Sequence, residues 1–429
     1  WTTATGELDP TPEPDSAYSF QLVASTGTAG GTLTYTLQSG ALLAGHSLSS
    51  SGVISGTSTG VADDTATFTV RVTDEGGLFA DRSFTTTITA IANFLMLAHG
   101  GTATANSFLR KSLPTPDGGL VHVGYSNGLP GISNYQIFVV KTDAAGASVW
   151  QKSFDATSTA NTDQSESAAI DSSGNIYICG RTYSGSEYRA LVIKLNSSGA
   201  LQWQRTLHIA GDSSTLFDVT IDSSNNVIAV GSTQSELDGN PVGVLIAKWN
   251  SSGTLQWRRY LSGGGSDYGR GVAVDSNDNI YVGGNVGGAT AGAGNEDAFL
   301  AKYNSSGAIQ WQRVLGGAVS EYFYSIAVDS NDDIICRGQT SSVVSGKTLL
   351  LIAKYNSSGA LQFQKTLQSS SGATIHNLYT YGTALAVDSS DNFYVAASLS
   401  GGTYIGTSND GFIVKYNSSG IVQWSKLLG

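Results

Sequence analysis

The sequence of 429 residues contains little charge. Only 13% of its residues are Asp, Glu, Lys or Arg, which is too few to cover many helices, because exposed helix positions are normally filled with these residues and Gln. The formal net charge is −11, so the chain lacks the basic surface that a nucleic-acid backbone demands. These shortages predict an all-β protein with no nucleic-acid partner.

Long hydrophobic runs are also missing. The longest, residues 91–98, is too short to span a bilayer as a helix, so no membrane insertion is expected. The first residue is Trp1, the single methionine is Met96, and no secretory leader is present, which suggests a processed chain or a piece of a longer one. An apolar fraction of 40% is still enough for real cores, and 58 Ser, 41 Thr and 53 Gly are typical of a turn-rich extracellular β protein.

Patterns that carry catalysis are scarce as well. The five histidines show no HxxxH or HxH spacing, and the chain has no Gly-x-Ser-x-Gly elbow, Walker loop or CxxC pair. The adjacent carboxylates Glu296 and Asp297 are interpreted as solvated loop residues. We therefore predict that the protein is not an enzyme and holds no catalytic residues and no cofactor.

What the sequence does contain is one unit repeated six times between residues 103 and 429. One half of the unit reads Lys-Leu-Asn-Ser-Ser-Gly-Ala-Leu-Gln-Trp at 194–203, and its lysine recurs at spacings of 53, 54, 54, 52 and 61 residues. The other half reads Asp-Ser-Asn-Asp-Asn-Ile-Tyr-Val-Gly-Gly at 275–284. Apolar residues alternate within each unit, which indicates four short antiparallel strands per repeat of about 50 residues. Such units predict the blades of a β-propeller.

The repeat favours six blades. A seven-bladed ring remains the alternative, because residues 93–101 resemble a further copy of the fourth strand. We assign residues 91–102 to a linker or an extra outer strand. One aromatic position in each blade is interpreted as packing between blades, and the equivalent lysines as strand-surface charges. These positions are Trp150, Trp203, Trp257, Trp311, Phe363 and Trp424, and Lys141, Lys194, Lys248, Lys302, Lys354 and Lys415.

Two Asp-rich turns partly match the sequence pattern of a calcium-binding loop. The segments 275–279 and 329–333 match the first three ligand positions of an oxygen-cage calcium loop, but both lack its Gly and its bidentate Glu. Asp, Asn and Ser also close tight turns by bonding to their own backbone, and we favour that interpretation. Calcium is the alternative, there and at the acidic residues Glu7, Asp9, Glu13 and Asp15, so no metal ligand is assigned.

The two cysteines are not expected to pair. Cys179 and Cys336 lie on the second strands of blades 2 and 5, one position out of register, so they face opposite sides of their sheets. Two alpha carbons must lie within about 7 Å of each other to form a disulfide. Blades on opposite sides of a ring do not bring them that close.

Residues 1–90 form a separate region with two arginines against nine acidic residues. Short strands alternate with turns at a spacing that fits an immunoglobulin-like β-sandwich. Residues 35–57 and the closing strand Phe-Thr-Val-Arg-Val-Thr-Asp at 68–74 resemble the "putative Ig", cadherin-like modules of bacterial and phage surface proteins. That family usually has Pro where Leu43 and Ser58 stand, and an aliphatic residue where His46 stands.

Residues 103–429 resemble the bacterial β-propeller repeats of secreted, surface and phage tail proteins. Together the two resemblances imply an extracellular or virion-surface structural protein, such as a phage tail appendage. Its partners would be other virion or surface proteins or a host cell-surface glycan. A bacterial cell-surface adhesin and a secreted propeller polysaccharide lyase or hydrolase remain alternatives.

Contact with a partner is expected where the repeat is interrupted, because loops that break a repeat carry function more often than its regular turns. The interruptions contain four tyrosines that we predict as binding residues: Tyr183, Tyr188, Tyr379 and Tyr381. The insertions themselves are residues 182–188, 234–242, 285–296 and 372–381.

Overall fold

The computed structural model describes most of the chain: residues 1–3, 6–7, 17–26, 31–57, 65–87, 106–127, 134–155, 162–207, 213–234, 242–287, 296–317, 319–341, 348–367, 374–376, 384–400 and 410–428. These residues form strands and turns, and no helical segment among them has the length and hydropathy of a membrane span. The chain divides into two compact units, Trp1–Ala98 and His99–Gly429.

The first unit is a sandwich of two sheets, with strand orders β1-β7-β6-β3 and β2-β5-β4. Along β6, Phe68, Val70 and Val72 are buried between the sheets while Thr69 and Arg71 between them are less buried, which is the alternation of a half-buried strand. The strands are β1 (Gly6–Glu7), β2 (Ala17–Gln21), β3 (Leu33–Gly40), β4 (His46–Leu48), β5 (Val53–Thr57), β6 (Thr65–Asp74) and β7 (Phe79–Thr87). This architecture confirms the predicted Ig-like sandwich.

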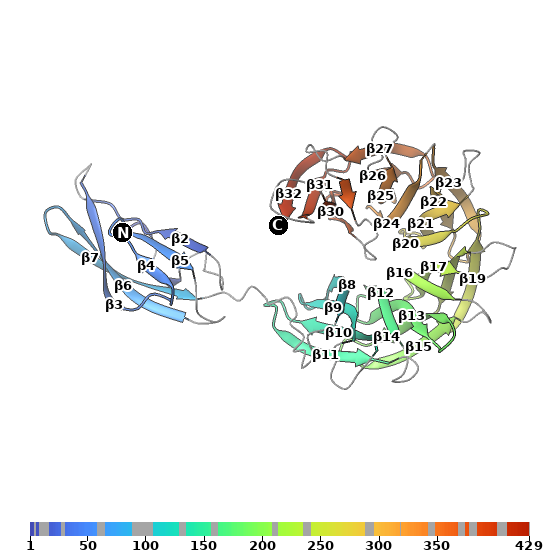
Figure 1. The fold of residues 1–429 in the computed structure, drawn as a ribbon, viewed down its shortest axis with the longest axis horizontal. Coiled ribbons are helices and arrows are strands. Elements are labelled where there is room, and N and C mark those ends of the chain that lie inside the picture. The colour runs from blue at the N-terminus through green and yellow to red at the C-terminus, as the bar shows by residue number, and fades with distance from the viewer. Residues whose placement is uncertain are drawn as a thin grey trace. The chain divides into compact units, whose positions relative to one another are not determined.

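The second unit is a β-propeller with six blades in the described residues (Figure 1). Each of the first five blades is one run of four consecutive antiparallel strands. Blade 1 consists of β8 (Ser107–Pro114), β9 (Leu120–Ser126), β10 (Gln136–Thr142) and β11 (Ser148–Phe154), and blade 2 of β12 (Asp163–Ile170), β13 (Ile176–Tyr183), β14 (Tyr188–Leu195) and β15 (Leu201–Leu207). Blade 3 consists of β16 (Ser214–Ile221), β17 (Val227–Thr233), β18 (Gly243–Trp249) and β19 (Leu255–Leu261), and blade 4 of β20 (Tyr268–Val274), β21 (Ile280–Gly287), β22 (Glu296–Tyr303) and β23 (Ile309–Leu315). Blade 5 consists of β24 (Glu321–Val328), β25 (Ile334–Ser341), β26 (Thr348–Tyr355) and β27 (Leu361–Leu367).

Blade 6 differs in its innermost position, where two short strands, β28 (Thr374–His376) and β29 (Leu385–Val387), both pair with β30 (Phe393–Ser400). The blade continues with β31 (Asp410–Tyr416) and β32 (Val422–Leu428). Residues 91–102, which the sequence assigned to a linker or an extra outer strand, lie outside the described residues.

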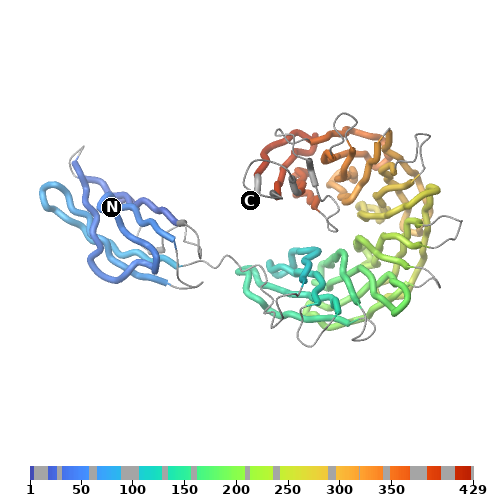
Figure 2. Tube along the Cα trace, in the orientation of Figure 1, coloured from blue at the N-terminus to red at the C-terminus, as the bar shows by residue number. Residues whose placement is uncertain are grey.

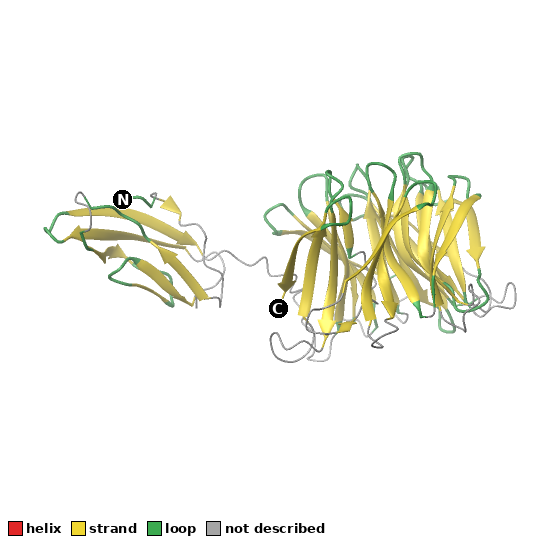
Figure 3. Cartoon of the chain, turned by 90° about the horizontal axis from the view of Figure 1, so that it is seen from above, coloured by secondary structure: helices red, strands yellow, loops and turns green. Residues whose placement is uncertain are grey.

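The two ends of the blades are built differently (Figure 3). One end, here called the turn face, carries the tight turns between strands 1 and 2 and between strands 3 and 4, such as 275–279 and 304–308 in blade 4. The other end, here called the loop face, carries the connections between strands 2 and 3 and between blades. Of the predicted insertions, residues 182–188 fall at the loop face, between β13 and β14. Most residues of the other three insertions lie outside the described residues.

Neighbouring blades are joined by an aromatic ring that packs on a glycine. The ring of Trp203 lies directly against Gly253, whose φ of +81° only glycine adopts easily. A β-carbon placed on Gly253 would lie 2.7 Å from the Trp203 ring, so the absence of a side chain there permits the contact. The same pairing joins Trp150 to Gly199, Trp257 to Gly307, Trp311 to Gly359 and Phe363 to Gly420. This confirms the predicted packing role of the aromatic position.

The six blades form an arc that does not close on itself (Figures 1 and 2). No further blade among the described residues covers Trp424 of blade 6, and this side chain is 38% exposed where Trp203 is 9% exposed. At the other end, Gly146 of blade 1 is exposed, whereas its five equivalents are buried under an aromatic ring. Blade 6 therefore ends on a free ring and blade 1 begins on a free glycine.

Both cysteines are free, as predicted, and both are buried. Cys179 packs in the core between blades 2 and 3, and Cys336 in the core between blades 4 and 5. Cys179 faces the following blade and Cys336 faces the preceding blade, which matches their difference in register.

Candidate functional site

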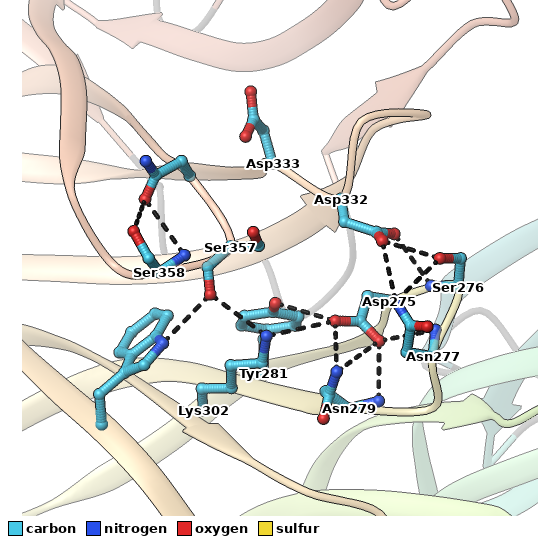
Figure 4. A network of polar contacts seen from close by, with 12 residues as sticks. Asp275, Ser276, Asn277, Asn279, Tyr281, Lys302, Asp332, Asp333, Ser357 and Ser358 are labelled. Carbon is cyan, nitrogen blue, oxygen red and sulfur yellow. Dashed lines mark hydrogen bonds and ion pairs between the residues drawn. The ribbon is translucent and has the colours of Figure 1, made fainter.

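The Asp-rich turns have the geometry of side-chain-capped turns. Asp275 Oδ1 accepts hydrogen bonds from the backbone N–H groups of Asn277 (3.0 Å) and Asn279 (2.8 Å), and its carboxylate also accepts from the Asn279 amide (Figure 4). The hydroxyl of Tyr281 and the ammonium of Lys302 approach Oδ2 at 3.0 and 3.5 Å. The carboxylate oxygens therefore face hydrogen-bond donors, which supports the turn interpretation over the calcium one.

Four of the six lysines, Lys194, Lys248, Lys302 and Lys354, connect neighbouring blades, and for these four the prediction of strand-surface charges was wrong. Lys302 donates to the backbone carbonyl of Ser357 in blade 5 as well as pairing with Asp275 (Figure 4). In blade 3 the pair is tighter: Lys248 and Asp222 lie 2.8 Å apart with side chains only 4% and 2% exposed. The next blade covers this strand position, which a pattern confined to one blade could not reveal.

The pKa values of these aspartates are lowered, which predicts acid sensitivity. Burial acts to raise the pKa of Asp275, but the hydrogen bonds from Asn279, Tyr281 and Asn277 outweigh it. The pKa is also lowered at Asp171, Asp222 and Asp388. A carboxyl group with a depressed pKa in the folded state contributes stability above its unfolded pKa of about 3.9, and this stability is lost as pH falls through the folded value.

We therefore expect the urea midpoint of the protein to fall between pH 5 and pH 2.5. In an Asp275→Asn variant the difference between the two midpoints should shrink, because one of the titrating groups is gone. An unchanged difference would show that other carboxyl groups cause the acid sensitivity.

On the inner side of the arc, the first strand of each of blades 1 to 5 contains a β-bulge at the same place. The ladder skips one residue between Leu109 and Lys111 and between Ser165 and Ser167, and at the corresponding position in the next three blades. A bulge re-aims the extra side chain. The bulged residues are Arg110, Glu166, Phe217, Arg270 and Tyr324.

Three arginines surround the buried carboxylate of Glu166. Arg110 lies 3.4 Å from Glu166 Oε2 and also donates to the Tyr125 hydroxyl. Burial raises the pKa of Glu166, and the positive charges of three guanidinium groups oppose that shift, those of Arg110, Arg181 and Arg270. The carboxylate of Glu166 thus lies in a locally cationic environment in a protein of net charge −11.

A second buried pair lies beside this cluster. Asp218 Oδ1 accepts from the Ser167 hydroxyl at 2.8 Å and Oδ2 from the backbone N–H of Val272 at 3.0 Å, so one carboxylate links three blades. Burial raises the pKa of Asp218 and lowers that of Lys111, while the charge of each acts against the other's shift. The opposite charges of Lys111 and Asp218 therefore each favour the ionised form of the other.

Two of the predicted binding residues, Tyr183 and Tyr188, face each other across a hairpin on the loop face. Tyr183 ends β13 and Tyr188 begins β14, their ring centroids are 5.1 Å apart, and both side chains are half-buried. The Tyr183 hydroxyl donates to the carbonyl of Gly185, and the guanidinium of Arg181 lies 4.4 Å from the Tyr188 ring centroid. The tyrosine pair is therefore continuous with the arginine cluster.

The remaining predicted residues have different outcomes. Tyr379 and Tyr381 lie outside the described residues. Glu296 and Asp297 are not solvated loop residues as predicted, because both belong to β22 and Asp297 is fully buried. Of the acidic residues near the start of the chain, Asp9, Glu13 and Asp15 lie outside the described residues.

Comparison with known families agrees with this architecture. Residues 2–89 match the family described as "Putative Ig domain", and residues 256–285 match the family described as "Beta-propeller repeat". The chain combines an Ig-type domain with propeller repeats. No curated protein matches the chain.

Solved structures with some likeness to this chain are all of low similarity. The β-propeller domain of the Trilobed protease from Pyrococcus furiosus is 12% identical, with a TM-score of 0.40 over 75% of this chain and 95% of that one. The apocarotenoid oxygenase of Synechocystis is 10% identical (TM-score 0.43; 97% and 94% covered), and the acylaminoacyl peptidase of Pyrococcus horikoshii is 11% identical (0.40; 76% and 52%). These values carry no argument about activity.

The bulged residues were missed by the sequence analysis, although the repeat contained a signal for them. At this one position the copies carry Arg, Glu, Phe, Arg and Tyr, while small residues such as Ser165 and Ser167, or Gly269 and Gly271, flank it in two of the blades. Positions that pack in the same way in every blade keep similar residues in every copy of the repeat. A position that instead varies among large side chains is not under that packing constraint.

Proposed function

We propose that the protein is a non-enzymatic structural and adhesive component of a phage virion, in which the loop face of the propeller binds a glycan of the host surface. The observation that supports this is the tyrosine pair of the loop face, with an arginine beside it. A tyrosine ring offers an apolar face for the C–H groups of a sugar and a polar tip for its hydroxyls. The flanking ion pair of Arg189 and Glu187, at 3.3 Å, adds further polar groups.

Replacing Tyr188 with Ala is expected to weaken glycan binding by about tenfold or more, since loss of one stacked aromatic contact is worth on the order of 1–2 kcal/mol. Binding would be measured on a glycan array and then by calorimetry. The matched control is Phe79→Ala, which removes an exposed aromatic side chain of the first unit. Equal binding by Tyr188→Ala and the parent protein would contradict the proposed role of the pair.

Two further measurements separate the alternatives. Antibody labelling of intact phage particles and of host cells distinguishes a virion component from a bacterial cell-surface adhesin. Incubation with each bound polysaccharide, followed by analysis of the products, distinguishes a binding protein from a lyase or hydrolase. Release of oligosaccharides would refute the non-enzymatic proposal.

A further inference from the structure

We propose that Arg181 and Arg270 form a site for the carboxylate of an acidic sugar on the inner side of the propeller. This inference rests on the proposed glycan binding and deepens it, because it names the chemical class of the ligand. Three observations lead to it: the two guanidinium groups are unpaired, aromatic rings hold them in place, and both act on one buried carboxylate.

Neither guanidinium has a carboxylate partner. Arg181 donates from Nε and Nη2 to the amide oxygen of Gln164 at 2.8 and 2.6 Å, and Arg270 donates from Nε to the amide oxygen of Asn285 at 3.3 Å. Both acceptors are neutral. Within the described ranges, no carboxylate lies at ion-pair distance from either group, whereas Arg110 is paired with Glu166. Two formal charges are therefore left uncompensated at contact distance.

The rings around these arginines orient the planar groups. The Arg270 guanidinium carbon lies 4.8, 5.4 and 5.4 Å from the ring centroids of Tyr268, Phe217 and Tyr324, and that of Arg181 lies 4.4 Å from Tyr188. These distances are those of cation–π contacts, which leave the N–H groups of a guanidinium available to hydrogen-bond acceptors. With Nε occupied by Asn285, Arg270 retains both of its terminal nitrogens for a planar acceptor, and a carboxylate accepts such a fork bidentately.

Glu166 ties the two arginines to one region, although they lie on blades 2 and 4. Its carboxylate is fully enclosed, and the charges of both Arg181 and Arg270 act on it. An anionic sugar bound by these arginines would lie near Glu166 and would stack on the adjoining rings. A neutral sugar would stack on the rings but leave the two charges uncompensated, which is why we assign an acidic sugar to the site.

The test uses the full chain and carboxylated oligosaccharides with carboxyl-reduced counterparts: oligogalacturonate, oligomannuronate, hyaluronan fragments and oligosialate. Calorimetry should detect binding of at least one of them, with the reduced counterpart bound at least about tenfold more weakly. Arg181→Gln and Arg270→Gln should each weaken binding of the acidic form by about tenfold or more, and each should weaken binding of the acidic form more than binding of the reduced form. Arg270→Lys keeps the charge but not the forked pair of donors, so its affinity for the acidic form should lie between those of Arg270→Gln and the parent protein.

Arg258→Gln is the matched control, because it removes one positive charge from the exposed outer strand β19 and should leave binding unchanged. Thermal unfolding of every variant checks that its fold is intact. Equal binding of acidic and reduced forms, unaltered binding by both glutamine variants, or no binding of any carboxylated probe would overturn the inference. If a neutral glycan binds and Tyr188→Ala abolishes that binding, the proposed function stands and this inference alone fails; if no glycan binds, both fail.

Discussion

The Gly253→Ala variant is expected to lose about 2–5 kcal/mol of unfolding free energy. A left-handed backbone costs an L-residue about 1–2 kcal/mol, and overpacking adds about 1–3 kcal/mol. Both terms apply here, because Gly253 has a φ of +81° and a new β-carbon would lie 2.7 Å from the Trp203 ring. Urea unfolding followed by tryptophan fluorescence would measure the loss.

The Gly146→Ala variant separates the cost of the left-handed backbone from the cost of overpacking. Gly146 has a φ of +84° like its equivalents, but it is exposed because no blade precedes blade 1. Its substitution should cost only the backbone term of about 1–2 kcal/mol. An equal loss at Gly146 and Gly253 would mean that Trp424 covers Gly146 in solution and that the arc closes.

Removing the carboxylate of the buried pair in blade 3 should have an effect of similar size. In Asp222→Ala, the ammonium of Lys248 would keep the Ser305 carbonyl as acceptor but lose its counter-ion, at a position where its side chain is 4% exposed. Breaking a buried ion pair from one side typically costs about 3–5 kcal/mol, because an uncompensated charge remains inside. The loss would be measured as a shift of the urea midpoint.

The double variant Asp222→Ala with Lys248→Met should recover part of that loss, since the uncompensated charge is removed with its partner. Asp143→Ala is the control for the turn itself. Asp143 caps its turn through the N–H groups of Ala145 and Ala147 but is exposed, and its loss should cost about 0.5–1.5 kcal/mol. A double variant as unstable as the single one would show that the turn, and not the charge, is responsible.

Periodicity within one blade was enough to predict the propeller. Alternating apolar residues and recurring Asp and Asn turns identify four strands per unit, and the aromatic position is identifiable because a large ring recurs at a fixed distance from the turn. The unpaired cysteines also followed from register alone, since Cys179 and Cys336 face opposite sides of their sheets. All of these features depend on residues close together in the chain.

The errors concern contacts between blades. Lys248 alternates as an outward-facing strand residue would, and only the adjacent turn of blade 4 makes it a buried charge. Likewise, Glu166 and Arg270 are the bulged residues of the first strands of blades 2 and 4, and Arg181 lies on the second strand of blade 2, so this region combines residues of two blades. A repeat shows what its copies share, whereas this site depends on how they differ.

The open arc has a consequence for how the propeller unfolds. In a closed ring every blade has two neighbours, and losing one interface leaves the rest linked. Here five interfaces, each with one aromatic–glycine contact, join six blades in a row, so the loss of any one interface leaves two separate stacks. The propeller is thus a linear array with unlike ends, whose cooperativity is set by its weakest junction and whose terminal blades open first.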